Sequence, residues 1–221
     1  MKVILYGATG MVGQGVLREC LLDAGVEQIL SIGRSPLAQV DPKVREMVLP
    51  DLSAYAGREG ELSNYDACFF CLGISAAGMT EVDYHRVTYD FTLAASNSLV
   101  KLNPGMTFIY VSGAGTDSSE KGRIMWARVK GKTENALLRL PFKSVYLFRP
   151  AGIRPLHGIT SRTRAYRIFY VLAWPFLPLL TRAFPSFMTT TERIGRAMLK
   201  AARVGAPKAV LESRDINALG V

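Results

Sequence analysis

Residues 2–13 read KVILYGATGMVG, and this stretch decides the fold. The run KVILY is short, apolar and rich in β-formers, and an apolar pattern of helical spacing continues through Val16, Leu17 and Leu21. A glycine turn between a strand and a helix is typical of phosphate binding, because glycine lets the backbone approach the phosphate and the helix N-terminus offers free N–H groups. We therefore expect a nucleotide at this turn.

The glycines have the spacing GxxGxxG rather than the GxGxxG of the usual dinucleotide fingerprint. The physical requirement is the same, since the turn must be tight and the helix must pack closely on the strand. The expected cofactor contacts in the turn and the first helical turn are Gly7, Thr9, Gly10, Met11, Val12 and Gly13.

Strand-like and helical segments alternate through most of the remaining chain. Apolar runs predict strands over 28–32, 45–49, 66–72, 106–112 and 144–148, and helical periodicity predicts helices over 82–102, 124–138 and 191–202. This alternation predicts an α/β fold with a doubly wound parallel sheet, the Rossmann fold. With 221 residues, we expect one domain over 1–221, in which 151–221 form a small basic, aromatic C-terminal cap and the last elements of the fold.

The end of the second predicted strand bears on the choice of cofactor. An acidic residue about 20 positions after the glycine turn would bind the adenosine ribose of NAD, whereas an arginine accommodates the 2′-phosphate of NADP. This chain has Arg34 there. A guanidinium can bind a phosphate bidentately and stack on adenine, so NADP(H) is favoured over NAD(H). The alternative is a solvated loop arginine.

The net charge of +9 is unevenly distributed. Residues 1–150 hold 16 basic and 15 acidic side chains, whereas residues 151–221 hold 11 basic and 3 acidic ones. No nucleic-acid-binding motif accompanies the basic region, so no nucleic acid is expected as a partner. Its segment 168–181 is uncharged, contains Trp174, Pro175 and Pro178, and is flanked by Arg162, Arg164, Arg167 and Arg182. A substrate lid or an oligomer contact is favoured, and a peripheral contact with an anionic membrane is the alternative, since the segment is too short to span a bilayer.

Cysteine and histidine are scarce. Cys68 and Cys71 form a CxxC, but residues three apart on a strand face opposite sides of the sheet, which argues against a redox or metal pair. His85 and His157 have no second ligand at a metal-binding spacing, so no metal site is expected. Three cysteines and no secretory signal predict a cytoplasmic protein. If the basic segment contacts a membrane, we expect the protein to be located peripherally at the membrane surface.

Several segments, taken in their order, resemble the atypical short-chain dehydrogenase/reductase superfamily, whose members are NAD(P)-binding and include epimerase- and dehydratase-like proteins. Within it, the chain is similar to the group related to the Tat-interacting oxidoreductase-like protein TIP30. The similarity covers nearly the whole chain. It rests on GATGMVG at 7–13, SIGR at 31–34, CLG at 71–73, VKGKTE at 129–134, FRP at 148–150 and VLESRDINALG at 210–220.

The resemblance implies further cofactor contacts. Asp51 and Leu52 would lie beside the adenine, although Asp51 could equally cap a helix. Leu72 and Gly73 would pass under the adenosine ribose and the pyrophosphate. Lys130 would hold the nicotinamide ribose hydroxyls, and Pro150 with Ala151 would border the nicotinamide.

The usual proton-transfer chemistry of the superfamily is incomplete here. There, a Tyr-xxx-Lys pair on one helix face acts with a Ser or Thr hydroxyl, but Trp126 stands four residues before Lys130. An indole does not titrate near neutral pH and cannot replace the phenol. Ser112 is the candidate hydroxyl, although several relatives carry it one position later, at Gly113 here.

Other donors on the predicted long helix are Tyr84, His85 and Tyr89, although aromatic residues at helical spacing are more often core or interface residues. Two functions remain open. One is an NADP-dependent oxidoreductase or epimerase-type enzyme with a nonstandard site that acts on an unknown small molecule. The other is an inactive NADP(H)-binding regulator with a protein partner. A homo-oligomer is compatible with both.

Overall fold

The computed structural model describes residues 1–37, 41–160, 183–184 and 186–221. A seven-stranded sheet with all neighbours parallel crosses its centre, in the order β3-β2-β1-β4-β5-β6-β9. The strands are β1 (Lys2–Tyr6), β2 (Gln28–Gly33), β3 (Val44–Val48), β4 (Ala67–Phe70), β5 (Thr107–Val111), β6 (Ser144–Arg149) and β9 (Val210–Glu212). The expected doubly wound parallel sheet is confirmed, and the last strand, β9, is one that periodicity did not predict.

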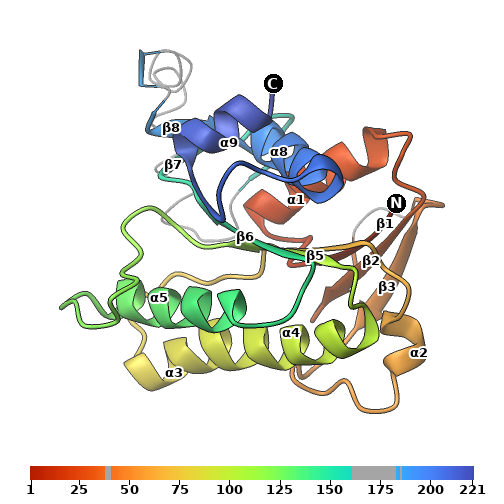
Figure 1. Ribbon diagram of the computed structural model, residues 1–221, viewed down its shortest axis with the longest axis horizontal. Helices are drawn as coiled ribbons and strands as arrows, with labels where there is room; N and C mark the ends of the chain where they lie inside the picture. The colour runs from red at the N-terminus through yellow and green to blue at the C-terminus, as the bar shows by residue number, and fades with distance from the viewer. Residues whose placement is uncertain (38–40, 161–182, 185) are drawn as a thin grey trace.

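Helices cover both faces of this sheet (Figure 1). One layer contains α1 (Met11–Leu22), α8 (Thr191–Val204) and α9 (Ser213–Leu219), and the other contains α3 (Glu81–His85), α4 (Phe91–Leu102) and α5 (Met125–Leu138). A short helix, α2 (Glu59–Leu62), lies before β4. Three layers of this kind bury the apolar faces of the helices against the sheet, as an α/β protein requires.

The central strands carry apolar residues on both faces because both faces are covered. In β1, Ile4 and Tyr6 belong to the core beneath α4 and α5, whereas Val3 and Leu5 belong to the core shared with α1 and α8. Each of these side chains is at most 1% exposed, and full burial of such a side chain contributes about 1.5–3 kcal/mol. The same alternation separates the CxxC cysteines: Cys68 lies in the first core and Cys71 packs against the second.

The helix expected over 82–102 is not a regular α-helix. A π-helical turn, η1 (Arg86–Asp90), joins α3 to α4. Thr80 caps the beginning of α3, accepting a hydrogen bond from the backbone N–H of Asp83 at 3.2 Å. The wider π turn changes which side of α3 faces the protein relative to α4, and this change matters for the site described below.

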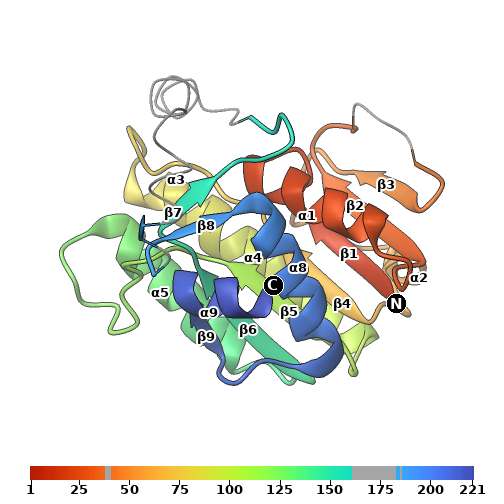
Figure 2. The ribbon, with the colours of Figure 1, turned by 90° about the horizontal axis from the view of Figure 1, so that it is seen from above.

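After Pro150 the chain adds small elements and returns to the main sheet. β7 (Gly152–Arg154) and β8 (Met188–Thr190) form a separate two-stranded parallel sheet. Figure 2 shows β7 and β8 beside α8 and α9, near the carboxyl end of β6. The uncharged segment 168–181 and its four flanking arginines lie outside the described residues, so the lid, oligomer and membrane interpretations remain predictions. None of the helices in the described part of the chain has both the length and the hydropathy needed to cross a membrane.

Candidate functional site

The candidate site lies along the edge of the sheet where its parallel strands end. The turn after β1, the end of β2 and the loops after β4, β5 and β6 all reach this edge, and in doubly wound folds ligands bind outside the carboxyl ends of the strands. Among the described residues, two pockets at this edge contain expected site residues. One is built around the glycine turn and the other around Lys130.

The glycine turn is shaped by two positions that exclude a side chain. Gly7 has φ +76°, and a Cβ there would lie 2.8 Å from the backbone nitrogen of Leu72. A Cβ on Gly13 would lie 2.0 Å from the carbonyl oxygen of Gly7. Glycine at both places therefore lets α1 begin directly against the turn and lets the turn pass close to the loop after β4.

No capping side chain or acidic residue of α1 itself occupies the N-terminus of this helix. Its N-cap residue, Gly10, offers no capping side chain, and its first turn contains no acidic residue. The backbone N–H of Gly10 donates to the carbonyl of Gly7 at 2.9 Å, which closes the turn. The N–H groups of the first helical turn, together with the positive end of the helix dipole, suit an anionic group.

A cavity of about 320 Å³ adjoins this turn, and it gathers residues from three of the expected regions. Gly7 and Thr9 come from the turn, Arg34 follows β2, and Leu72 follows β4. The Arg34 side chain is exposed, and no carboxylate of the described residues pairs with it. Gly10, Met11, Val12 and Gly13 form the start of α1 beside this cavity rather than its lining.

The residues expected at the adenine lie elsewhere. The Asp51 carboxylate accepts hydrogen bonds from the backbone N–H and the hydroxyl of Ser53, at 2.9 and 2.7 Å, and these bonds lower its pKa. It caps no helix, because α2 begins only at Glu59. Leu52 is buried in the core at 2% exposure. Neither residue lines the cavity beside Arg34, and their contact with adenine remains a prediction.

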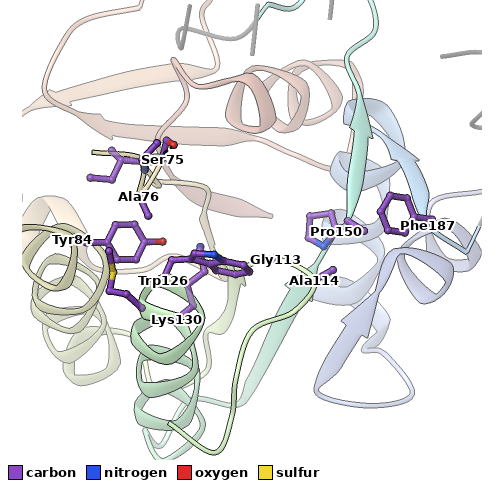
Figure 3. Close-up of a pocket in the computed structure, with 13 residues that line it drawn as sticks. Ser75, Ala76, Tyr84, Gly113, Ala114, Trp126, Lys130, Pro150 and Phe187 are labelled. Atoms are coloured by element: carbon purple, nitrogen blue, oxygen red, sulfur yellow. Dashed lines mark hydrogen bonds between the residues drawn. The ribbon is translucent and has the colours of Figure 1, made fainter. Parts of the chain in front are cut away.

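The second pocket has a volume of about 760 Å³ and opens between α3, α5 and the loops after β4, β5 and β6. It brings together four of the expected site residues, Trp126, Lys130, Pro150 and Ala151 (Figure 3). Gly73 is not part of this lining. The full lining consists of Ile74, Ser75, Ala76, Ala77, Tyr84, Gly113, Ala114, Met125, Trp126, Lys130, Pro150, Ala151 and Phe187.

Lys130 projects from α5 into an environment that disfavours its charge. Its Nζ lies 3.4 Å from the carbonyl oxygen of Ser112 and 5.5 Å from the ring centroid of Tyr110. Loss of solvation lowers the pKa of Lys130 to about 8, and the carboxylate of Glu134 opposes this shift. At neutral pH the ammonium is still the main form, so it can donate hydrogen bonds to hydroxyl groups of a bound ligand.

A buried ion pair holds this part of α5 against the end of β6. The Arg149 guanidinium donates from Nε to Glu134 Oε1 at 3.0 Å, and Glu134 is only 1% exposed. The next residue, Pro150, accepts a hydrogen bond at its carbonyl from the backbone N–H of Ala114 at 3.1 Å. The loops after β5 and β6 are thereby fixed to each other on one side of the Lys130 pocket.

Ser112 is close to Lys130, but its hydroxyl is occupied within its own loop. Ser112 Oγ lies 2.8 Å from Thr116 Oγ1, and Thr116 in turn donates to the carbonyl of Gly113 at 2.8 Å. The pocket is lined by Gly113 and Ala114 and not by Ser112. Thr116 was not expected here, because nothing in the sequence marks a loop threonine as the partner of that serine. A catalytic role for Ser112 remains a prediction.

Of the three aromatic donors considered on the long helix, one reaches the pocket. Tyr84 lines it, and Figure 3 shows its hydroxyl directed toward Trp126. His85 and Tyr89 instead contact each other with tilted rings, whose centroids are 4.7 Å apart, and both contact Lys132. Tyr84 is thus the site residue that sequence reasoning undervalued.

Comparison with known proteins supports the fold. No family model matches the chain. In structure, the chain is similar to the WbmF enzyme of Bordetella bronchiseptica in complex with NAD+, with a TM-score of 0.70, 17% identity, and coverage of 98% of this chain and 76% of WbmF. It is also similar to the UDP-glucose 4-epimerase of Thermotoga maritima with UDP-glucose, with a TM-score of 0.68, 13% identity, and coverage of 96% and 76%. The Rossmann fold is confirmed, and the broad resemblance to epimerase- and dehydrogenase-like proteins is supported at the level of the fold.

The curated relatives match this chain at low identity and over only part of their own length. The chain is 28% identical to the leucinostatins biosynthesis cluster protein T of Purpureocillium lilacinum over 167 residues, which cover 73% of this chain and 61% of that protein. It is 25% identical to the mitochondrial protein FMP52 of Kluyveromyces lactis over 157 residues, which cover 69% and 67%. The chain thus spans about three fifths of the first relative and two thirds of the second.

These relatives correct one expectation. The sequence predicted a cytoplasmic protein, but several of the similar proteins carry the name FMP52 and are described as mitochondrial. The prediction of a cytoplasmic location was therefore wrong. It rested on few cysteines and no secretory signal, and these features do not distinguish the cytoplasm from other reducing compartments.

Proposed function

We propose that the chain binds NADP(H) along the carboxyl edge of its sheet and acts as an oxidoreductase of the short-chain dehydrogenase type with a nonstandard site. The observation that carries this proposal is the placement of Arg34 in one cavity with the glycine turn. A pyrophosphate at the N-terminus of α1 would place the adenosine 2′-phosphate of NADP near the Arg34 guanidinium, which forms no ion pair with a carboxylate of the described residues. The complexes of the structural neighbour WbmF with NAD+ support a nicotinamide dinucleotide as the ligand.

The residues of the two pockets suit the pyrophosphate, the 2′-phosphate and the nicotinamide part of such a cofactor. The first turn of α1 offers backbone donors to the pyrophosphate, and Lys130 offers an ammonium to the nicotinamide ribose. Pro150 and Ala151 would border the nicotinamide, in the pocket that also contains Trp126. The bound cofactor would supply or accept a hydride, and the protein would orient the ring and exclude water.

Calorimetric titration of the protein with NADP+ and NAD+ tests this proposal. We expect NADP+ to bind about tenfold or more tightly, since a hydrogen bond to a charged group contributes about 1.5–3 kcal/mol. If neither nucleotide binds, the proposal fails. If both bind equally, Arg34 is a solvated loop residue and the preference for NADP(H) is wrong.

A second function is favoured by Trp126, whose indole stands where the superfamily has its acid-base phenol. The chain would then be a regulator that binds NADP(H) without turnover and presents the loaded state to a protein partner. The variant Trp126→Tyr tests this alternative through nicotinamide absorbance with carbonyl and alcohol substrates. An inactive wild type whose variant gains turnover would support a scaffold that has lost its acid, because general acid catalysis contributes about 10²–10⁴-fold in rate. A wild type that already turns over, with activity unchanged by the substitution, would contradict the regulator.

A further inference from the structure

The walls of the Lys130 pocket are mostly apolar. Ile74, Met125, Trp126, Pro150 and Phe187 contribute large nonpolar groups from four separate segments. Among the described residues that line it, Lys130 carries the one charge. Burial of such walls against a ligand is favourable only if the ligand is itself largely nonpolar.

This lining differs from what a sugar nucleotide requires. The diphosphate of such a ligand is bound by arginine, lysine or backbone N–H groups that neutralise its charge. The Lys130 ammonium is the one cation of the described lining, and the proposed cofactor already uses it. Some structural neighbours hold UDP or UDP-glucose, so the described lining separates this chain from them by ligand class.

The pocket also contains a phenol beside Trp126 (Figure 3). Tyr84 comes from α3, which packs beside α5, and it is 2% exposed. The ring is held among other buried groups, while the hydroxyl points into the pocket toward Trp126 (Figure 3). A phenol can donate a hydrogen bond to a carbonyl oxygen, whereas an indole ring provides a flat nonpolar surface beside it.

We propose that this pocket receives an uncharged carbonyl compound with a flat apolar body, and that the Tyr84 hydroxyl donates a hydrogen bond to its carbonyl oxygen. The inference deepens the proposed oxidoreductase function and rests on it. In the reductive direction the carbonyl carbon gains a hydride from NADPH, and the carbonyl oxygen gains the Tyr84 proton. The phenolate left behind regains a proton from water, and the Lys130 ammonium in the same pocket offsets its negative charge while it lasts.

The test compares three probe ligands by equilibrium dialysis, with and without saturating NADP+. The probes are 9,10-phenanthrenequinone, phenanthrene, which has the same rings and no oxygen, and UDP-glucose. We expect the quinone to bind the wild-type protein at least about tenfold more tightly than UDP-glucose. Tighter binding of UDP-glucose would overturn the proposed ligand class, whichever residues of the chain bound its diphosphate.

The variant Tyr84→Phe tests the hydrogen bond, and Tyr89→Phe is the matched control, because Tyr89 lies on the neighbouring turn and outside the pocket. Loss of one hydrogen bond should weaken quinone binding about three- to tenfold in Tyr84→Phe and leave Tyr89→Phe unchanged. Phenanthrene binding should be the same in all three proteins, which shows that the pocket itself is intact.

Equal quinone binding by Tyr84→Phe and wild type would overturn the role of Tyr84. A loss of phenanthrene binding together with quinone binding would also overturn it, because Tyr84 would then only support the pocket wall. Failure of the proposed function is seen separately. It appears as absence of NADP+ binding by calorimetry, while the dialysis without nucleotide still measures the pocket.

Discussion

Two pockets lie on one edge of the same sheet, and they are built by different means. The cavity beside Arg34 is formed largely by backbone, since two glycines exclude side chains and the first turn of α1 supplies N–H groups. The Lys130 pocket is formed by side chains from α3, α5 and several loops. A site built from backbone binds a chemical group that many ligands share. The residues of a site built from side chains can differ between proteins that keep the same fold.

The largest effect is expected from Gly13→Ala, which places a Cβ 2.0 Å from the Gly7 carbonyl oxygen. The turn must open, which should lower the free energy of unfolding by about 3 kcal/mol and weaken NADP+ binding at least about tenfold. Urea denaturation and calorimetry measure the two effects. The control is Gly60→Ala in α2, where no atom lies within 4 Å of the new Cβ. Identical unfolding of both variants would show that the turn has room for a side chain.

An intermediate effect is expected from Arg34→Ala. Because the guanidinium would form charged hydrogen bonds to the 2′-phosphate, NADP+ affinity should fall about tenfold or more. NAD+ affinity should fall much less, since only the stacking on adenine is lost. Arg45→Ala, an exposed arginine on the adjacent strand β3, should change neither affinity. A parallel loss of both nucleotides in Arg34→Ala would mean that the side chain supports the turn rather than selecting the cofactor.

The smallest effect concerns the side-chain pocket and pH. The pKa of Lys130 is lowered from 10.5 to about 8 in the folded protein, so the unfolded chain binds the proton more tightly. Wild-type stability should therefore rise relative to Lys130→Met as the pH increases through about 8 toward 10.5. Since the Lys130 side chain is only half-buried, we expect this rise in the free energy of unfolding relative to Lys130→Met to be about 1 kcal/mol.

Urea denaturation at pH 7 and pH 9.5 measures this difference. Lys132→Met, on the exposed face of the same helix, is the control and should follow the wild type at both values. A fall in the stability of the wild type relative to Lys130→Met over this range would contradict the direction of the pKa shift.

The backbone-built half of the site could be predicted from the sequence because a strand, a glycine turn and a helix determine its shape locally. Gly7, Thr9, Arg34 and Leu72 indeed meet in one cavity. The Lys130 pocket was only partly foreseen. Trp126 and Lys130 could be paired by their spacing on one helix, but which loops and side chains face them depends on packing between distant elements.

Tyr84, which was named only as one of three possible donors, shows most clearly why the rest could not be predicted. The sequence pattern predicted one regular helix over 82–102, but η1 lies within that range and breaks the helical period. The pairing of the Ser112 hydroxyl with Thr116 could not be predicted for a related reason, since it depends on the shape of a loop that has no periodic signal. The strands β7, β8 and β9 are three residues long, too short for alternation to identify them.

The π turn also affects how the site tolerates insertions and deletions. In a helix each residue rotates the chain by about 100°, so removing one residue from Arg86–Asp90 would turn α3 by that angle relative to α4. Tyr84 would leave the pocket wall while every core contact of α4 stayed in place. Among proteins of this fold, the presence or absence of a single residue at this point could thus decide whether a phenol faces the pocket, without any substitution of the phenol itself.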